Sequence, residues 1–171
     1  MPARRDAGED LVHQIIRKYD QRALILGDRY QSFYYPEVAR ASARHVDAVS
    51  SNVNAGWNDG SFARYHLETL RALTGRPVFV SEFYMAAREN RSGNENKPGF
   101  PVVDTQRERV AGFNRTLELL VRIPYVVGAD WFQYYDEPTH GRADARTTTS
   151  DWWISTTNPA RHWSQPPPRW T

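Results

Sequence analysis

Helix-like and strand-like patterns alternate along most of the chain, and this alternation constrains the fold more than any other feature. Apolar residues spaced three and four apart predict helices over residues 9–19, 36–45, 61–73 and 105–122. Between them lie four apolar runs typical of buried strands, over residues 23–26, 46–50, 77–82 and from Tyr125 onward. Strict alternation of helices with apolar strands predicts a parallel sheet covered by helices, and hence an α/β fold.

The segments between these patterns narrow the choice of parallel architecture. No glycine-rich phosphate loop follows any of the four strands, which argues against a doubly wound nucleotide-binding sheet. The other common parallel architecture is the (β/α)8 barrel, whose functional site is formed by the loops after its strands. Four strands would make half of such a barrel.

Length, charge and composition exclude several functional classes. A chain of 171 residues, 40% hydrophobic, suits one domain with one core. Twenty-two basic residues are scattered among 20 acidic ones, so a nucleic-acid partner is not expected. No run of apolar residues approaches a membrane span, and no signal-peptide pattern opens the chain, so the compartment stays unassigned. Cysteine is absent and the histidines lack metal-ligand spacing, so neither a metal nor a cofactor is expected.

Polar and aromatic side chains gather directly after the predicted strands. In a (β/α)8 barrel, residues just past the C-terminal end of a strand point into the site. Glu82 closes the third strand, and the other candidates at strand ends are Arg29, Asn52, Asn54, Trp57, Tyr84, Trp131 and Gln133. Amides and acids bond sugar hydroxyls, an indole stacks on a pyranose face, and a central carboxylate can attack an anomeric carbon. This combination indicates a carbohydrate substrate.

Several candidates also have a purely structural interpretation. Glu82 could be a solvated acid or a salt-bridge partner, and Trp131 could pack in the core. Trp57 could lie on the loop surface. Asn52 could cap a turn.

For Arg29 and His66 the structural interpretation is preferred. Arg29 is expected to pair with its neighbour Asp28. His66 is expected on the surface of its helix.

The four strand ends, taken in order, resemble the second half of clan A glycoside hydrolases, which are retaining (β/α)8 enzymes. PVFVSEFY resembles their seventh strand and VVGADWFQYYDEP their eighth. YDQRALILGDRY resembles the fifth strand with its lead-in helix, and VDAVSSNVN the sixth. The likeness is to agarase-like and β-galactosidase-like members and covers roughly residues 9–144. It implies a partial (β/α)8 TIM barrel, strands five to eight with their helices.

The resemblance also implies roles for particular residues. Glu82 matches the nucleophile that closes the seventh strand, and Trp131 matches a common sugar platform. The complete enzyme would then hydrolyse β-glycosidic bonds in poly- or oligosaccharides with retention of configuration.

The sequence departs from this family in two places. The family carries its acid/base Glu after an Asn at the end of strand four, and no such pair precedes the first helix here; Asn94–Glu95 follows the Glu82 strand instead. Many members place a Tyr after strand six, where this chain has Asn54. Whether the chain itself is an enzyme therefore stays open. The alternative is a non-catalytic remnant that binds carbohydrate or docks a partner.

The last segment, residues 145–171, differs in character from residues 1–144. It holds four of the six Trp and four of the eleven Pro, with no clear period. We hypothesise that it is an out-of-frame translation, because one permitted codon choice for residues 145–157, read two bases later, encodes a run typical of the segment after strand eight in these enzymes. Half a barrel would expose two sheet edges, so self-association is expected as well, including a pseudo-barrel with two copies of Glu82.

Overall fold

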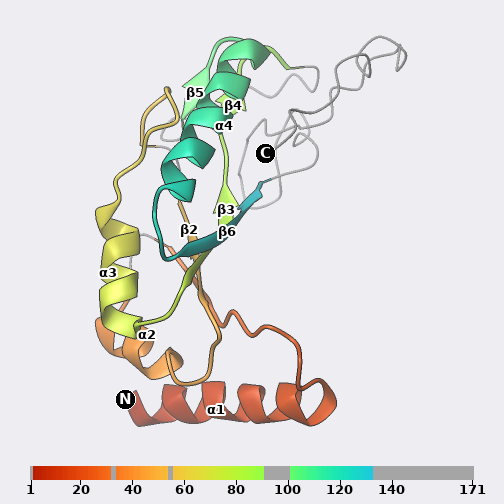
Figure 1. Cartoon of the computed structure of the whole chain (residues 1–171), viewed down its shortest axis with the longest axis vertical. Helices are drawn as coiled ribbons and strands as arrows, with labels where there is room; N and C mark the ends of the chain where they lie inside the picture. Colours follow the sequence, from red (N-terminus) through yellow and green to blue (C-terminus); the bar gives the residue numbers. More distant parts are fainter. Residues whose placement is uncertain (1, 32–33, 54–55, 91–100, 133–171) are drawn as a thin grey trace.

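A four-stranded parallel sheet organises the chain in the computed structural model, which describes residues 2–31, 34–53, 56–90 and 101–132, with side chains from Gly8 onward (Figure 1). Its strands lie in the order β1 (Arg29–Tyr30), β2 (Val49–Asn52), β3 (Val78–Phe83) and β6 (Val126–Trp131). Each neighbouring pair is parallel. The predicted α/β fold with a parallel sheet is confirmed, whereas the partial eight-stranded barrel stays a prediction.

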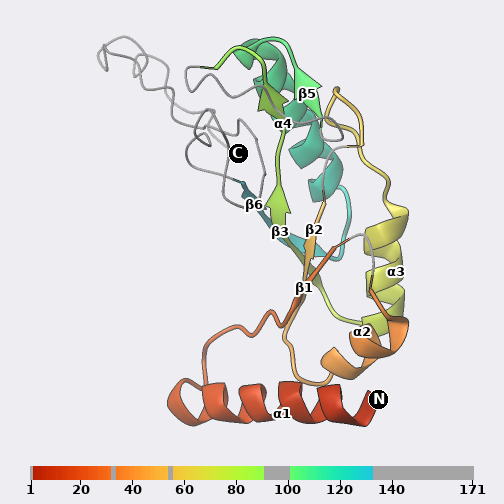
Figure 2. The same cartoon turned by 180° about the vertical axis from the view of Figure 1, so that it is seen from behind.

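Among the described residues, four helices accompany the sheet: α1 (Pro2–Tyr19), α2 (Pro36–Ser42), α3 (Tyr65–Thr74) and α4 (Gln106–Val121). Seen from either side, α3 stands beside the sheet and α1 lies across one end of the molecule, next to α2 (Figures 1 and 2). The order of these four helices and of the four strands of the main sheet along the chain is the one that the sequence predicts.

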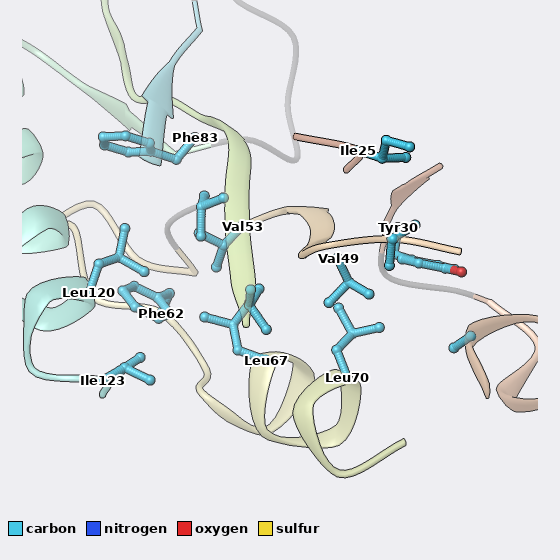
Figure 3. Close-up of a cluster of buried hydrophobic side chains, with 14 residues drawn as sticks. Ile25, Tyr30, Val49, Val53, Phe62, Leu67, Leu70, Phe83, Leu120 and Ile123 are labelled. Atoms are coloured by element: carbon cyan, nitrogen blue, oxygen red, sulfur yellow. The ribbon is translucent and has the colours of Figure 1, made fainter. Parts of the chain in front are cut away.

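The core lies between the sheet and the helices (Figure 3). Val49 of β2 faces Leu67 and Leu70 of α3, and all three side chains are fully buried. Leu120 of α4 and Ile123 just after it extend the same cluster. Burying an aliphatic side chain of this size contributes about 1.5–3 kcal/mol, so this cluster fixes the sheet against its helices.

The first strand begins later than predicted. The apolar run at residues 23–26 lies beside β2 without forming a regular strand. The carboxylate of Asp47 accepts the backbone N–H of Ile25 at 2.9 Å, so a side chain takes the place of a ladder partner. Gly27 then has φ of 65°, which is not a strand conformation. Regular pairing consequently starts only at Arg29.

Three other boundaries shift by a few residues. The second helix ends at Ser42 rather than near residue 45, and the second strand begins at Val49 rather than Val46. The third helix begins at Tyr65 rather than near residue 61, because the backbone N–H groups of Gly56 and Trp57 both donate to the carbonyl of Ser61. That turn occupies the residues on which the helix was predicted to start.

The fourth helix matches its prediction closely, because its first turn carries a complete capping box. The N–H of Glu108 donates to Thr105 Oγ1 at 3.2 Å, and the N–H of Thr105 donates to Glu108 Oε2 at 2.8 Å. Two otherwise unpaired backbone donors are thereby satisfied, and the helix begins at Gln106.

A short parallel pair occurs where the sequence predicts only a loop. Strand β4 (Ala86–Ala87) pairs with β5 (Val102–Val103). The N–H of Arg88 continues the pairing to the carbonyl of Val103 at 2.9 Å. This pair joins the segment after β3 to the start of α4.

Helix α1 shows the predicted amphipathic pattern, but most of its apolar stripe is not covered. Ile16 packs against the core. Leu11, Val12, Ile15 and Tyr19 are exposed by 57%, 56%, 49% and 80%. The helix thus leaves an apolar surface toward solvent. None of the helices in the described residues combines the length and apolar character that a bilayer span requires.

Candidate functional site

The parallel register brings the predicted strand-end residues of β2 and β3 side by side. Asn52, the last residue of β2, is the register partner of Glu82 on β3. The N–H of Val53 donates to the carbonyl of Glu82 at 3.0 Å and extends the pairing past the strand. Two of the predicted site residues therefore share one edge of the sheet.

An irregularity in the pairing sets the direction of the Glu82 side chain. Ser51 pairs with Val80, but Asn52 pairs with Glu82, so Ser81 has no register partner on β2. An extra residue of this kind is a β-bulge, which bends a strand and redirects the side chains after it. The carboxylate of Glu82 consequently lies on the side of the sheet where Arg29 reaches it.

Glu82 is a buried carboxylate held by an arginine. Its side chain is 9% exposed, and Oε2 accepts a hydrogen bond from Arg29 Nη1 at 2.6 Å. A bond between two charged groups is short and strong compared with a neutral one. The prediction that Arg29 pairs with Asp28 was wrong, because the guanidinium of Arg29 reaches across the sheet to Glu82 instead.

Hydroxyl groups and an amide continue the polar surface next to Glu82. Ser50 Oγ donates to Ser81 Oγ at 2.7 Å, and Ser81 Oγ lies 3.5 Å from Asn52 Oδ1 at the limit of hydrogen bonding. Since Asn52 is partly buried and bordered by these groups, it is part of the polar end of the sheet rather than a turn cap. Carboxylate, guanidinium, amide and hydroxyl groups thus meet at one place.

Trp131 lies at the end of β6 and is partly buried. Its ring meets Phe83 edge-on at 5.2 Å between centroids and Phe113 edge-on at 5.1 Å. These contacts fix the indole against the aromatic part of the core. The packing interpretation therefore accounts for the ring contacts of Trp131, and its role as a sugar platform stays a prediction.

The other two aromatic candidates differ in exposure. Tyr84 is buried, with its ring 6.4 Å from that of Phe132. Trp57 is 58% exposed and lies in the turn that its own N–H closes onto Ser61. Trp57 thus presents an aromatic surface to solvent, whereas Tyr84 is packed inside. Asn54 and Gln133 fall outside the described residues.

Sequence reasoning missed a polar cluster around His66. The ring is half-buried rather than on the surface: Nε2 lies 2.8 Å from Ser51 Oγ, and Tyr34 meets the ring edge-on at 5.6 Å. Loss of hydration in this setting lowers the pKa of His66 below its usual range. The helical spacing indicates that His66 is partly buried, because Phe62, His66 and Leu70 fall on one face of the helical pattern.

No cluster of three or more His, Cys, Asp or Glu side chains arranged to hold a metal ion occurs in the part of the chain that the structure describes. The groups that meet at the strand ends can hydrogen-bond hydroxyls and present one carboxylate.

Comparison with known proteins finds similarity between the chain and agarases. No protein-family model matches the chain. It is 29% identical over 110 residues to β-agarase B and 31% identical over 127 residues to β-agarase A, both from Vibrio sp. strain JT0107. These alignments cover 63% and 70% of the chain but only 11% and 12% of the two relatives. The chain therefore spans about a ninth of the length of these relatives.

Solved structures give the same result. An agarase matches 88% of the chain with a TM-score of 0.73 and 31% identity, over 20% of its own length. An exo-β-agarase matches with a TM-score of 0.72 and 29% identity, over 19% of its length. A β-glucuronidase of Bacteroides uniformis, 14% identical with a TM-score of 0.53, shares the fold alone. Together these similarities support a relationship with glycoside hydrolases.

Proposed function

We propose that this chain is part of the catalytic domain of a retaining glycoside hydrolase that acts on a β-linked polysaccharide of the agar type. The observation that carries the proposal is the carboxylate of Glu82, buried at the end of β3 and bonded to Arg29, in a chain similar to β-agarases. Glu82 is the nucleophile in this proposal, and it would form a covalent bond with the anomeric carbon of the sugar.

The geometry around Glu82 supports this role. Oε2 is engaged by Arg29, whereas Oε1 accepts no hydrogen bond among the described residues. One carboxylate oxygen is thus fixed while the other is left to approach a sugar carbon. Asn52 and Ser81 lie beside Glu82, and in this proposal they would bond sugar hydroxyls.

A retaining mechanism needs a second carboxyl group about 5–5.5 Å from the first, to protonate the leaving oxygen and later activate water. In the family that the sequence resembles, this group ends strand four, which corresponds to nothing in the present sequence. Loss of a general acid lowers the rate by about a hundred- to ten-thousandfold. We therefore expect residues 1–171 alone to be nearly inactive.

The second candidate function is carbohydrate binding without turnover. The exposed Trp57 ring favours it, because a solvent-facing indole is a surface on which a sugar ring can stack. Such binding would need neither a second carboxylate nor a closed barrel.

The deciding experiment begins with the source DNA upstream of Met1 and across the codon of Ala145. An in-frame upstream half whose fourth strand ends in Asn-Glu, with a single-base slip in the tail, is the result expected. The restored protein should then hydrolyse agarose, and Glu82→Gln should abolish turnover.

Glu118→Gln is the matched control for that experiment. It makes the same change in an exposed pair with Arg115 on α4, so turnover should not change. If the gene contained neither an upstream half nor a base slip in the tail, carbohydrate binding would become the favoured function instead of catalysis.

A further inference from the structure

A groove lies beside the sheet where the end of β1, the start of α2 and the first turns of α3 meet. Its volume is about 970 Å³, at the upper end of the range of small-molecule sites. Four of its lining residues are tyrosines, and His66 is among the others.

The aromatic rings that line the groove differ in how firmly they are held. Tyr34 meets Tyr30 edge-on at 5.3 Å and His66 edge-on at 5.6 Å, and the hydroxyl of Tyr30 donates to Ser42 at 2.7 Å. These contacts hold the inner rings in place. Tyr35 and Tyr65 are each 71% exposed, so most of each residue is open to solvent.

The polar groups in the groove are balanced in charge. Asp28 and Arg29 are its charged lining residues, one acidic and one basic. Gln31 adds an amide, and the tyrosine hydroxyls add donors and acceptors. A neutral ligand with many hydroxyl groups matches this lining better than an anion or a cation.

We propose that this groove is a second carbohydrate-binding surface, which takes a neutral sugar chain with Tyr35 and Tyr65 as the aromatic contacts. The inference rests on the proposed function for the choice of a sugar as ligand. Aromatic rings present an apolar face with a polar tip, and a pyranose presents an apolar C–H face with hydroxyls at its rim. The apolar C–H face of a pyranose can therefore stack on the exposed rings of Tyr35 and Tyr65.

The groove is separate from the carboxylate of Glu82 but adjacent to it. Arg29 lines the groove and also binds Glu82. A sugar chain held by Tyr35 and Tyr65 would therefore lie next to the proposed reaction centre. The surface would retain a polymer near the site.

Calorimetric titration of the chain with a neutral tetrasaccharide of agarose tests the proposal. Tyr35→Ala and Tyr65→Ala should each weaken binding roughly three- to tenfold, the range of aromatic contact energies. Tyr19→Ala is the matched control, because that ring is 80% exposed on α1 outside the groove and its loss should leave affinity unchanged. A sulfated galactan tetrasaccharide should not bind more tightly than the neutral one.

Two further variants separate the groove from the site around Glu82. Tyr35→Phe and Tyr65→Phe keep the ring and should retain most of the affinity, which guards against a folding defect in the alanine variants. Glu82→Gln should lose less affinity than either alanine variant. Affinity lost in Glu82→Gln but kept in both alanine variants would overturn the groove while leaving the proposed function intact.

Absence of any sugar binding by the parent chain would also overturn the proposal that the groove binds carbohydrate. The proposed function would then be decided separately, by turnover of the restored protein.

Discussion

Arg29 and Glu82 form an ion pair although their strands are not neighbours. Strand β2 lies between β1 and β3, yet Arg29 Nη1 and Glu82 Oε2 are 2.6 Å apart. The long arginine side chain passes along the end of β2 to reach a carboxylate that is itself buried. The pair therefore ties three strands together at the end where the candidate site lies.

Removing the guanidinium should destabilise the fold, because it leaves a buried carboxylate without its charged partner. We expect Arg29→Ala to lower the free energy of unfolding by about 1–2 kcal/mol, less than for a fully buried pair because Arg29 is half-exposed. Denaturant unfolding measures the change. The double variant with Glu82→Gln should recover part of the loss, since an amide costs less to bury than an unpaired charge.

Arg115→Ala is the matched control for this experiment. It breaks an exposed pair with Glu118 on α4 and should change stability by less than about 0.5 kcal/mol. Equal losses for Arg29→Ala and Arg115→Ala would contradict a special role of the Arg29–Glu82 pair.

The N-terminal cap of α4 should contribute measurably to stability. Thr105→Ala removes the acceptor for the N–H of Glu108, and we expect a loss of about 1 kcal/mol in unfolding free energy. Thr105→Ser keeps the hydroxyl and should be close to neutral. Chemical denaturation of the two variants side by side tests the assignment, and a Ser variant as weak as the Ala variant would speak against a cap.

The pH dependence of stability should carry a contribution from His66. Burial lowers the pKa of this residue in the folded chain, so the unfolded chain binds its proton more readily. Stability should fall as the pH drops through about 6.5, the ordinary value for histidine, until the folded ring is protonated as well. Above that pH the contribution disappears.

His66→Gln isolates this contribution, since an amide can bond to Ser51 but does not titrate in this range. The unfolding free energies of both proteins are measured between pH 5 and 8. The value for the parent chain minus the value for His66→Gln should decrease from pH 8 to pH 5. Parallel pH curves for the two proteins would show that His66 titrates alike in the folded and unfolded states.

The apolar surface of α1 should promote self-association. Leu11 and Ile15 are half-exposed or more on one face of the helix, and among the described residues β1 and β6 each have one unpaired edge. We expect light scattering after size-exclusion chromatography to show dimers or larger species. Leu11→Lys with Ile15→Glu should shift the distribution toward monomer. A monodisperse parent monomer that melts cooperatively would contradict this.

The sequence predicted the parallel sheet because its signal is local and repeated. Each strand is an apolar run and each helix a periodic one, so their order could be seen without tertiary contacts. The polar end of the sheet was predicted for the same reason, since Asn52 and Glu82 each close an apolar run. The features that escaped prediction depend on contacts between distant segments.

Three particular errors illustrate the limit. Arg29 was assigned to its sequence neighbour, because a pairing across 53 positions leaves no local trace. The sequence predicts His66 on the surface, because a polar residue in a helix is usually solvated. The pair of β4 and β5 was missed, because two residues in each strand give no recognisable alternation.

The bulge opposite Asn52 has a consequence for how this strand could change by mutation. Because Ser81 is passed over in the pairing, the direction of Glu82 depends on how many residues precede it in β3. Exchanging one apolar side chain for another upstream would leave that count intact. Deleting a single residue between Val78 and Ser81 would turn the carboxylate to the opposite face of the sheet. Apolar exchanges along this strand therefore keep the direction of the carboxylate, whereas insertions and deletions do not.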